Sequence, residues 1–414
     1  MSSPSLFTPL SLACGSQLPN RLAKAAMEEN LASSGQLPGD SLIGLYRRWA
    51  SGGSGLLITG NVMIDGAAMT GPGGIVLESG TPLEPFQRWA KAAQAGGAQV
   101  WMQLNHPGRQ TYANLGGKRW APSAVALDLG KHSGRFAMPK AMDEQDISQL
   151  IQRFADSARL AEQAGFDGVQ IHAAHGYLLA QFLSPLSNQR NDRWGGSLAN
   201  RARLLCEVIR AVRAQVSPRF AVAVKLNSAD FQRGGFDADD ALGVLHLLND
   251  LAVDLLEVSG GSYESPAMQG RTADGRTLAR EAYFLEFAAV LAREARMPLM
   301  TTGGIRRRAV AEQVLAQGVA VVGMATALSI APDLPKCWQA GDEVTAELPA
   351  INWSDKVMAA VATMAVIRRQ LRRLGNQRAS KPQASPVFSL LLDQVRLSRL
   401  TRRYRHWLAQ RNVA

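Results

Sequence analysis

Three side chains that can handle protons stand close together in an otherwise apolar stretch. His172, His175 and Tyr177 fall within Gln170–Pro185, between two apolar runs. Neutral imidazoles can donate hydrogen bonds to an oxygen that gains negative charge during a reaction. A tyrosine hydroxyl, whose ordinary pKa is about 10, can deliver a proton to a nearby carbanion. The trio therefore predicts that the histidines polarise a carbonyl group and that the tyrosine donates a proton.

A zinc site is the alternative interpretation of the two histidines, because imidazole is a common zinc ligand. No Asp, Glu or Cys in the same stretch completes a ligand set, so we expect no metal there. The three cysteines, Cys14, Cys206 and Cys337, are far apart and odd in number, which argues against a disulfide framework. The N-terminus has no signal-peptide pattern and no long apolar run occurs, so a cytoplasmic protein is expected.

Polar residues also occur inside two apolar strand candidates. Lys225 lies in "AVAVKLN", and Gln103 lies in the corresponding stretch of an earlier strand. A cation in an apolar strand is unfavourable unless it meets an anion or an electron-rich ligand. Two interpretations stay open. Each side chain satisfies backbone groups inside the fold, or each faces a polar heterocycle.

The last two strand candidates before residue 340 lead into glycines. Gly303 and Gly304 follow one strand and precede a helix, and Gly323 ends the next strand. Backbone N–H groups at such turns can bind phosphate, and glycine lets the backbone approach the anion closely. Ordinary strand-to-helix turns are the alternative. A phosphate site, a polar ring edge and a carbonyl-binding pair together predict FMN, which carries the hydride while the protein orients it.

Residues 1–340 alternate between short apolar runs and helical stretches, as is typical of a parallel sheet covered by helices. Eight such units predict an α/β protein with a (β/α)8 TIM barrel. A doubly wound sheet is the alternative, but it usually has fewer strands and a GxGxxG fingerprint, which this sequence lacks. The expected strands are Arg21–Met27, Gly55–Asn61, Gln99–Leu104, Gly168–His172, Ala221–Leu226, Leu255–Val258, Leu299–Thr302 and Ala320–Gly323.

The predicted barrel indicates where the trio lies in the fold. Active sites of these barrels lie at the C-terminal ends of the strands. His172 ends the fourth strand, and His175 and Tyr177 lie in the loop after it, so all three are expected at the barrel mouth. The long connection after the third strand, Asn105–Met142, is rich in glycine and proline and is expected to be a functional loop beside that mouth.

Residues 341–414 form a basic helical extension after the barrel domain. Twelve of the 45 basic residues but only one of the 34 acids, Asp393, lie in residues 366–414, so the net charge of +11 belongs to this tail. That distribution argues against nucleic-acid binding by the whole protein. The extension could pack on the barrel or on a second subunit of a homo-oligomer, contact an anionic surface or partner, or stay disordered. Its expected helices are Lys356–Leu374 and Val387–Ala409.

With these features assembled, the sequence resembles the Old Yellow Enzyme family of FMN-dependent oxidoreductases. The resemblance covers roughly residues 5–340. Its most specific part is the long central motif that begins with the trio. The motifs that carry it are "NRLAKAAM" (Asn20–Met27), "MQLNHPGR" (Met102–Arg109), "HAAHGYLLAQFLSPLSNQRNDRWGGSLANR" (His172–Arg201), "TTGGI" (301–305) and "VGMATAL" (322–328).

The resemblance implies FMN held non-covalently at the mouth of an eight-stranded barrel and a ping-pong reaction. NADH or NADPH reduces the flavin and leaves, and a small α,β-unsaturated carbonyl compound then binds. His172 and His175 match the pair that grips the carbonyl, and Tyr177 matches the usual proton donor. The implied cofactor contacts are Ala25, Ala26, Met27 and Gly60 along the ring, Gln103 and Lys225 at its pyrimidine edge, and Gly303, Gly304, Gly323 and Met324 around the phosphate.

Some positions depart from the family pattern. Glu28 stands where relatives commonly have Cys or Thr beside the flavin, and Asn30 stands where one branch has a substrate-binding Tyr. We therefore expect Glu28 at the cofactor and Asn30 at the substrate. "VGMATAL" lacks the frequent Gly-Arg pair, so the resemblance leaves one of the family's phosphate contacts open. These departures leave an alternative open: a flavin-binding protein with weak ene-reductase activity that its basic tail tethers to an anionic surface or partner.

Overall fold

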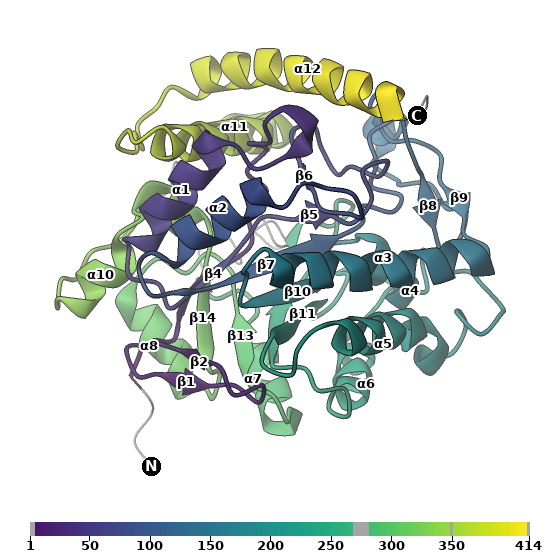
Figure 1. Cartoon of the computed structure of the whole chain (residues 1–414), viewed down its shortest axis with the longest axis horizontal. Helices are drawn as coiled ribbons and strands as arrows, with labels where there is room; N and C mark the ends of the chain where they lie inside the picture. The colour runs from purple at the N-terminus through teal and green to yellow at the C-terminus, as the bar shows by residue number, and fades with distance from the viewer. Residues whose placement is uncertain (1–4, 268–280, 348–350, 412–414) are drawn as a thin grey trace.

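Eight parallel strands close into a barrel in the computed structural model, which describes residues 5–267, 281–347 and 351–411 (Figure 1). Each strand pairs with the next along the chain, and the last pairs with the first. The predicted (β/α)8 barrel is confirmed, with strand ends within three residues of those expected. The barrel strands are β3 (Leu22–Lys24), β4 (Leu56–Ile58), β7 (Gln99–Asn105), β10 (Gly168–Ala173), β11 (Ala221–Asn227), β12 (Leu255–Ser259), β13 (Leu299–Thr301) and β14 (Val321–Met324).

Helices surround the barrel because the outward residues of its strands are apolar. Val100, Val169 and Val224 belong to the continuous core between strands and helices. The longest of the surrounding helices, α3, starts at a capping box in which the Asp143 carboxylate accepts the Asp146 N–H at 2.8 Å. The helices before residue 340 are α1 (Asp40–Ala50), α2 (Glu84–Gln94), α3 (Glu144–Gln163), α4 (Leu178–Leu183), α5 (Leu198–Gln215), α6 (Ala238–Leu248), α7 (Leu285–Glu294), α8 (Arg308–Ala316), α9 (Thr326–Ile330) and α10 (Leu334–Gln339).

Short strands that the sequence pattern did not predict complete the two ends of the barrel. The hairpin of β1 (Leu10–Ser11) and β2 (Gln17–Leu18) packs its leucines against the apolar barrel interior. At the other end, β5 (Val62–Met63) and β6 (Ile75–Val76) extend the sheet from β7. The long connection is also ordered, through β8 (Trp120–Ala121), the 3-10 helix η2 (Gly130–Arg135) and β9 (Lys140–Ala141); a second 3-10 helix, η1, covers Ser34–Gln36.

The inner face of four neighbouring strands changes from apolar to polar toward the C-terminal ends. On β7, Trp101 lies in the apolar interior, whereas Gln103 and Asn105, two and four residues later, are polar. Successive residues of a strand alternate between faces, so these three share one face. The other three strands repeat the change. Their inner polar residues are Gln170 and His172 on β10, Lys225 and Asn227 on β11, and Glu257 and Ser259 on β12.

The predicted basic extension consists of two antiparallel helices, α11 (Lys356–Gly375) and α12 (Pro386–Arg411). Figure 1 shows them side by side across the top of the view, with β1 and β2 at the opposite end. Within the described part of the chain, no helix is long and apolar enough to cross a membrane.

The single acid of the tail joins the two helices. Asp393 on α12 is fully buried and pairs with Arg368 at 2.6 Å and Arg372 at 3.2 Å, both on α11. Two arginines of α12, Arg396 and Arg403, donate to backbone carbonyls in the loop after β3, at Asn30 and Ala32. The extension is therefore fastened to the mouth end of the barrel.

Candidate active site

The structure brings the predicted trio together at the end of β10. The His172 ring centroid lies 5.1 Å from that of His175 and 5.0 Å from that of Tyr177. The chain turns sharply here, because His175 and Gly176 both have left-handed backbones, with φ of 60° and 71°. Left-handed backbone is unfavourable for a side chain other than glycine unless surrounding contacts hold it. The Asn227 side chain supplies one such contact by accepting the His175 N–H at 3.0 Å.

Both histidines are held in the neutral form. Burial lowers the pKa of His172 and of His175 well below the usual value of 6.5, and the nearby Lys225 ammonium lowers both further. The Nδ1 atom of His172 accepts the Ala174 N–H at 3.3 Å, which leaves Nε2 to carry the proton. His175 Nε2 lies 2.7 Å from Ser259 Oγ. Neutral imidazoles can therefore serve as hydrogen-bond donors at the mouth.

The Tyr177 hydroxyl is paired with a second tyrosine. Its oxygen lies 3.1 Å from the Tyr263 hydroxyl, in the loop after β12. Burial raises the pKa of both tyrosines, so both stay protonated at neutral pH. Sequence reasoning missed Tyr263 and Ser259, because they meet the trio only through the pairing of distant strands. The signal available in the sequence was the polar ending of "LLEVSGGSY" (255–263) after an apolar run.

Below the trio, a line of buried polar side chains crosses the barrel. Gln103 donates its amide to Gln170 at 2.7 Å, and Gln170 donates to Glu257 at 2.7 Å. The Lys225 ammonium pairs with the other oxygen of Glu257 at 2.9 Å. The two residues predicted to face a ring edge, Gln103 and Lys225, are thus in one connected layer. The sequence did not predict Glu257 as the anion that offsets the charge of the buried Lys225.

The other half of the mouth is lined by small residues. Ala25 lies on the inner side where β3 ends, and Gly60 follows β4. A β-carbon at Gly60 would lie 2.0 Å from Glu29 Oε2 and 2.2 Å from Met27 O, so only glycine fits. On the polar half, both amide atoms of the buried Asn105 have no hydrogen-bond partner among the described residues. Small residues facing polar side chains, one of them unsatisfied, fit a flat ring with a polar edge such as the isoalloxazine of FMN.

The two residues that depart from the family pattern lie beside this wall. Thr70 donates its hydroxyl to the Glu28 carboxylate at 2.8 Å, and burial raises the pKa of Glu28. Asn30 has a left-handed backbone with φ of 55°, and its amide donates to the Pro72 carbonyl at 3.2 Å. The Asn30 side chain is therefore engaged by the chain itself, and its role toward substrate stays a prediction.

The predicted phosphate turn has anion-binding donors. The Glu281 carboxylate accepts the backbone N–H groups of Arg306 and Arg307 at 3.0 and 3.2 Å. Gly304 has φ of 71°, and a β-carbon there would lie 2.5 Å from the Tyr283 hydroxyl. The turn thus binds a carboxylate of its own chain, and its N–H groups are of the kind that binds phosphate. Gly303, Gly323 and Met324 lie at the same end of neighbouring strands β13 and β14.

The described residues contain no group of three or more His, Cys, Asp or Glu side chains placed to hold a metal ion.

Buried neutral histidines make the stability of this protein depend on pH. Burial lowers the pKa of His106 to about 4, and those of His172 and His175 are also lowered, so the unfolded chain binds more protons below pH 6.5. We expect the free energy of unfolding to fall as the pH is lowered from 6.5 to 5. The expected loss is up to about 1.4 kcal/mol for each histidine and each pH unit. Urea unfolding across this range measures the slope.

His106→Gln is expected to remove about a third of that slope. His246→Gln is the control, because His246 is exposed on α6 and pairs only at 3.8 Å with Glu294. A stability that does not change between pH 5 and 6.5 would contradict the assignment of neutral histidines.

Comparison with known proteins identifies the family. The NADH:flavin oxidoreductase / NADH oxidase family matches residues 5–343. The NADH-dependent flavin oxidoreductase iliE of Hypocrea jecorina is 36% identical over 373 residues, which cover 85% of this chain and 92% of that protein. The iliE protein of Neonectria sp. is 39% identical over 384 residues, 86% of this chain, but the match spans only half the length of that relative.

A solved structure shows the same arrangement. The old yellow enzyme homologue from Zymomonas mobilis superposes with a TM-score of 0.72 and 26% identity, covering 83% of this chain and 95% of that one. The resemblance to the Old Yellow Enzyme family is confirmed, and with it FMN as cofactor and NAD(P)H as hydride donor. The extent and identity of these matches show that this chain belongs to the NADH:flavin oxidoreductase / NADH oxidase family.

Proposed function

We propose that this chain reduces the carbon–carbon double bond of α,β-unsaturated carbonyl compounds, with NADH or NADPH as hydride donor in a ping-pong reaction. The observation that carries the proposal is the neutral His172–His175 pair beside a protonated Tyr177, at the end of a strand whose inner face is polar. Hydrogen-bond donors and an acid within reach of one small volume suit a reaction in which an oxygen gains charge and a carbon gains a proton.

The residues of the mouth divide into those that hold the cofactor and those that meet the acceptor. Gln103 and Lys225 would hold the polar edge of the ring, with Ala25, Ala26, Met27 and Gly60 along its surface. The phosphate would lie against Gly303, Gly304, Gly323 and Met324, where Arg306 and Arg307 already bind a carboxylate. Bound FMN supplies the hydride chemistry.

The chain's own residues prepare the acceptor. His172 and His175 would donate hydrogen bonds to the acceptor oxygen, which draws electron density from the double bond. Tyr177 would deliver its proton to the α-carbon. Its high pKa makes the hydroxyl a reservoir that does not ionise beforehand, and the Tyr263 hydroxyl holds it in position.

Anaerobic spectroscopy tests this function. Purified protein loaded with FMN is expected to bleach when NADH or NADPH is added and to regain its yellow colour with 2-cyclohexenone. Protein that takes up no FMN would contradict the cofactor assignment. Protein that bleaches but is reoxidised only by oxygen, quinones or nitro compounds would contradict the proposed reaction while leaving the cofactor in place.

We propose a second role for the extension, peripheral contact with an anionic membrane surface. The outward face of α12 begins with an exposed apolar strip and continues, at helical spacing, into exposed arginines. Basic amphipathic helices bind anionic lipid in this way. The strip consists of Val387, Phe388, Leu391, Leu392 and Val395, and the arginines are Arg399, Arg402 and Arg405.

Vesicle sedimentation measures this contact. Leu391→Ser/Val395→Ser is expected to weaken binding to phosphatidylserine vesicles, and added salt is expected to weaken binding of the parent protein. Val290→Ser, at a side chain that is 49% exposed on α7, is the control. Equal binding to neutral phosphatidylcholine vesicles, or no binding to either, would contradict an anionic surface as partner.

A further inference from the structure

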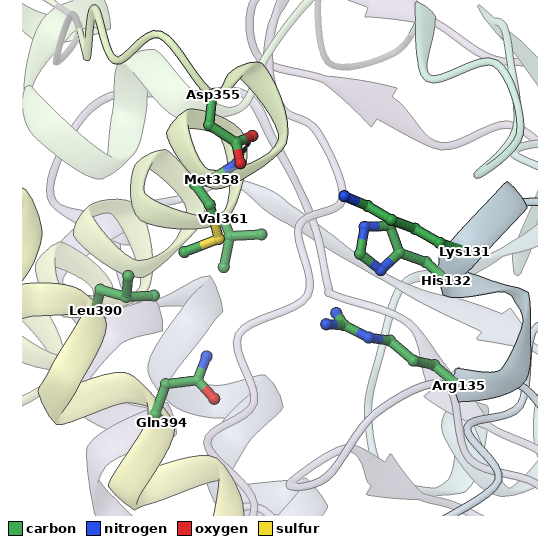
Figure 2. A pocket seen from close by; sticks show the side chains of 8 residues that line it. All are labelled: Lys131, His132, Arg135, Asp355, Met358, Val361, Leu390 and Gln394. Carbon is green, nitrogen blue, oxygen red and sulfur yellow. Dashed lines mark hydrogen bonds between the residues drawn. The ribbon is translucent and has the colours of Figure 1, made fainter.

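A cavity of about 420 Å³ lies between the long loop and the C-terminal helices. Figure 2 shows Lys131, His132 and Arg135 extending from η2 on one side. On the facing side stand apolar side chains of α11 and α12. We refer to this cavity as the basic–apolar pocket. Its other lining residues are Asp355, Met358, Val361, Leu390 and Gln394.

A chain of aromatic contacts connects the loop that lines the basic–apolar pocket with the trio. Arg135 precedes Phe136, which stacks on Tyr112 with centroids 4.7 Å apart and meets Tyr263 at 5.9 Å. Tyr263 in turn contacts the Tyr177 hydroxyl at 3.1 Å. Phe136 and Tyr263 therefore link the residue next to Arg135 to the proposed proton donor, which places the pocket and the trio on the two ends of one short chain of contacts.

One cation of the basic–apolar pocket also acts on Tyr112. Burial and the Glu28 carboxylate raise the pKa of Tyr112, whereas the guanidinium groups of Arg368 and Arg135 lower it. Of these charged groups, Arg135 belongs to the pocket, so one pocket cation acts on the ring that stacks on Phe136.

The charges of the basic–apolar pocket favour an anion. Lys131 and Arg135 are exposed cations. The one acid, Asp355, is the helix cap of α11, where its carboxylate accepts the Met358 N–H at 3.0 Å. The facing wall of Met358, Val361 and Leu390 suits a hydrocarbon segment rather than the riboses of a dinucleotide. The volume is within the range of small-molecule sites, about 300–1,000 Å³.

We propose that the basic–apolar pocket is a specificity subsite for a hydride acceptor that carries a carboxylate on an apolar chain or ring. The inference rests on the proposed function: the enone end lies at His172, His175 and Tyr177, the apolar segment lies against α11 and α12, and the carboxylate reaches Lys131 and Arg135. In this proposal α11 and α12 form part of the acceptor site in addition to packing on the barrel.

Calorimetry on the FMN-loaded protein tests the pocket without turnover. 4-Phenylbutyrate is expected to bind about 3- to 30-fold more tightly than its neutral methyl ester. Lys131→Ala/Arg135→Ala is expected to abolish the difference. Lys91→Ala/Arg210→Ala, which removes two exposed cations from α2 and α5, is expected to keep it. Equal affinities for acid and ester, or a preference that survives in Lys131→Ala/Arg135→Ala, would overturn the proposal.

The two half-reactions, measured separately, show whether the pocket binds the hydride acceptor or the donor, NADH or NADPH. Reoxidation of the reduced protein by a carboxylate-bearing aryl enone is expected to be about 3- to 30-fold more efficient than by its methyl ester, and only Lys131→Ala/Arg135→Ala should lose this ratio. If Lys131→Ala/Arg135→Ala instead weakens NADH or NADPH binding, the pocket binds the hydride donor and the proposal is wrong. If neither the carboxylate-bearing enone nor its ester reoxidises the parent protein, the proposed reaction fails, while calorimetry still decides the pocket.

Discussion

Replacing Tyr177 by Phe is expected to slow reoxidation of the reduced protein by 2-cyclohexenone about 10²- to 10⁴-fold, the usual contribution of a positioned general acid. Reduction of the bound flavin by NADH or NADPH should be nearly unchanged, because that step needs no proton from the hydroxyl. The Tyr177 ring packs against His172, so Phe keeps the contact and removes only the acid. Anaerobic stopped-flow absorbance separates the two steps.

Tyr263→Phe is the matched control for this result. It removes the hydroxyl that lies 3.1 Å from Tyr177 but leaves the proposed donor in place. We expect a loss of no more than about tenfold, because one neutral hydrogen bond contributes about 1 kcal/mol. A larger loss in Tyr263→Phe than in Tyr177→Phe would reassign the proton donor to Tyr263.

Asp393→Asn is expected to lower the free energy of unfolding by about 3 kcal/mol or more. The change leaves Arg368 and Arg372, largely buried at 15% and 18% exposure, without their shared anion. Breaking a buried ion pair by removing one partner typically costs about 3–5 kcal/mol. Urea unfolding of the FMN-loaded protein measures the loss, and hydrogen exchange is expected to rise most in α11 and α12.

Asp250→Asn is the control for Asp393→Asn. Asp250 pairs with Arg296 at 2.8 Å, but both side chains are more than 70% exposed. Exposed pairs typically contribute less than about 1 kcal/mol. Similar losses in the two variants would show that the buried pair does not hold the extension.

The barrel was predictable because its signals are local. Each strand is a short apolar run that ends in small or polar residues, and eight runs separated by helices suffice for the fold. The trio was predictable for the same reason, since His172, His175 and Tyr177 lie on one strand end and the loop after it. Lys225 and Gln103 stood out as polar residues within apolar strands.

What the sequence could not supply depends on pairing between distant segments. Glu257 offsets Lys225 only because β11 lies beside β12 in the observed register. Tyr263 lies in the loop after β12, and the fold brings its hydroxyl to that of Tyr177. The course of the extension was equally inaccessible: packing, surface contact and disorder were all compatible with its composition. The bonds of Arg396, Arg403 and Tyr404 to barrel loops show that the extension packs on the barrel, and these contacts join segments that are far apart in the sequence.

The way in which α12 is attached has a consequence for how this site can evolve. Arg396, Arg403 and Tyr404 bind the loops after β3 and β5 through the backbone carbonyls of Asn30, Ala32 and Gly66. Every amino acid offers the same carbonyl, but Gly66 leaves no room for a side chain, because a β-carbon there would lie 2.7 Å from Trp407 of α12. Mutations in the loop after β3 can therefore alter the wall that the proposed acceptor would meet without removing the carbonyls that bind the helix, so selectivity and attachment can evolve separately.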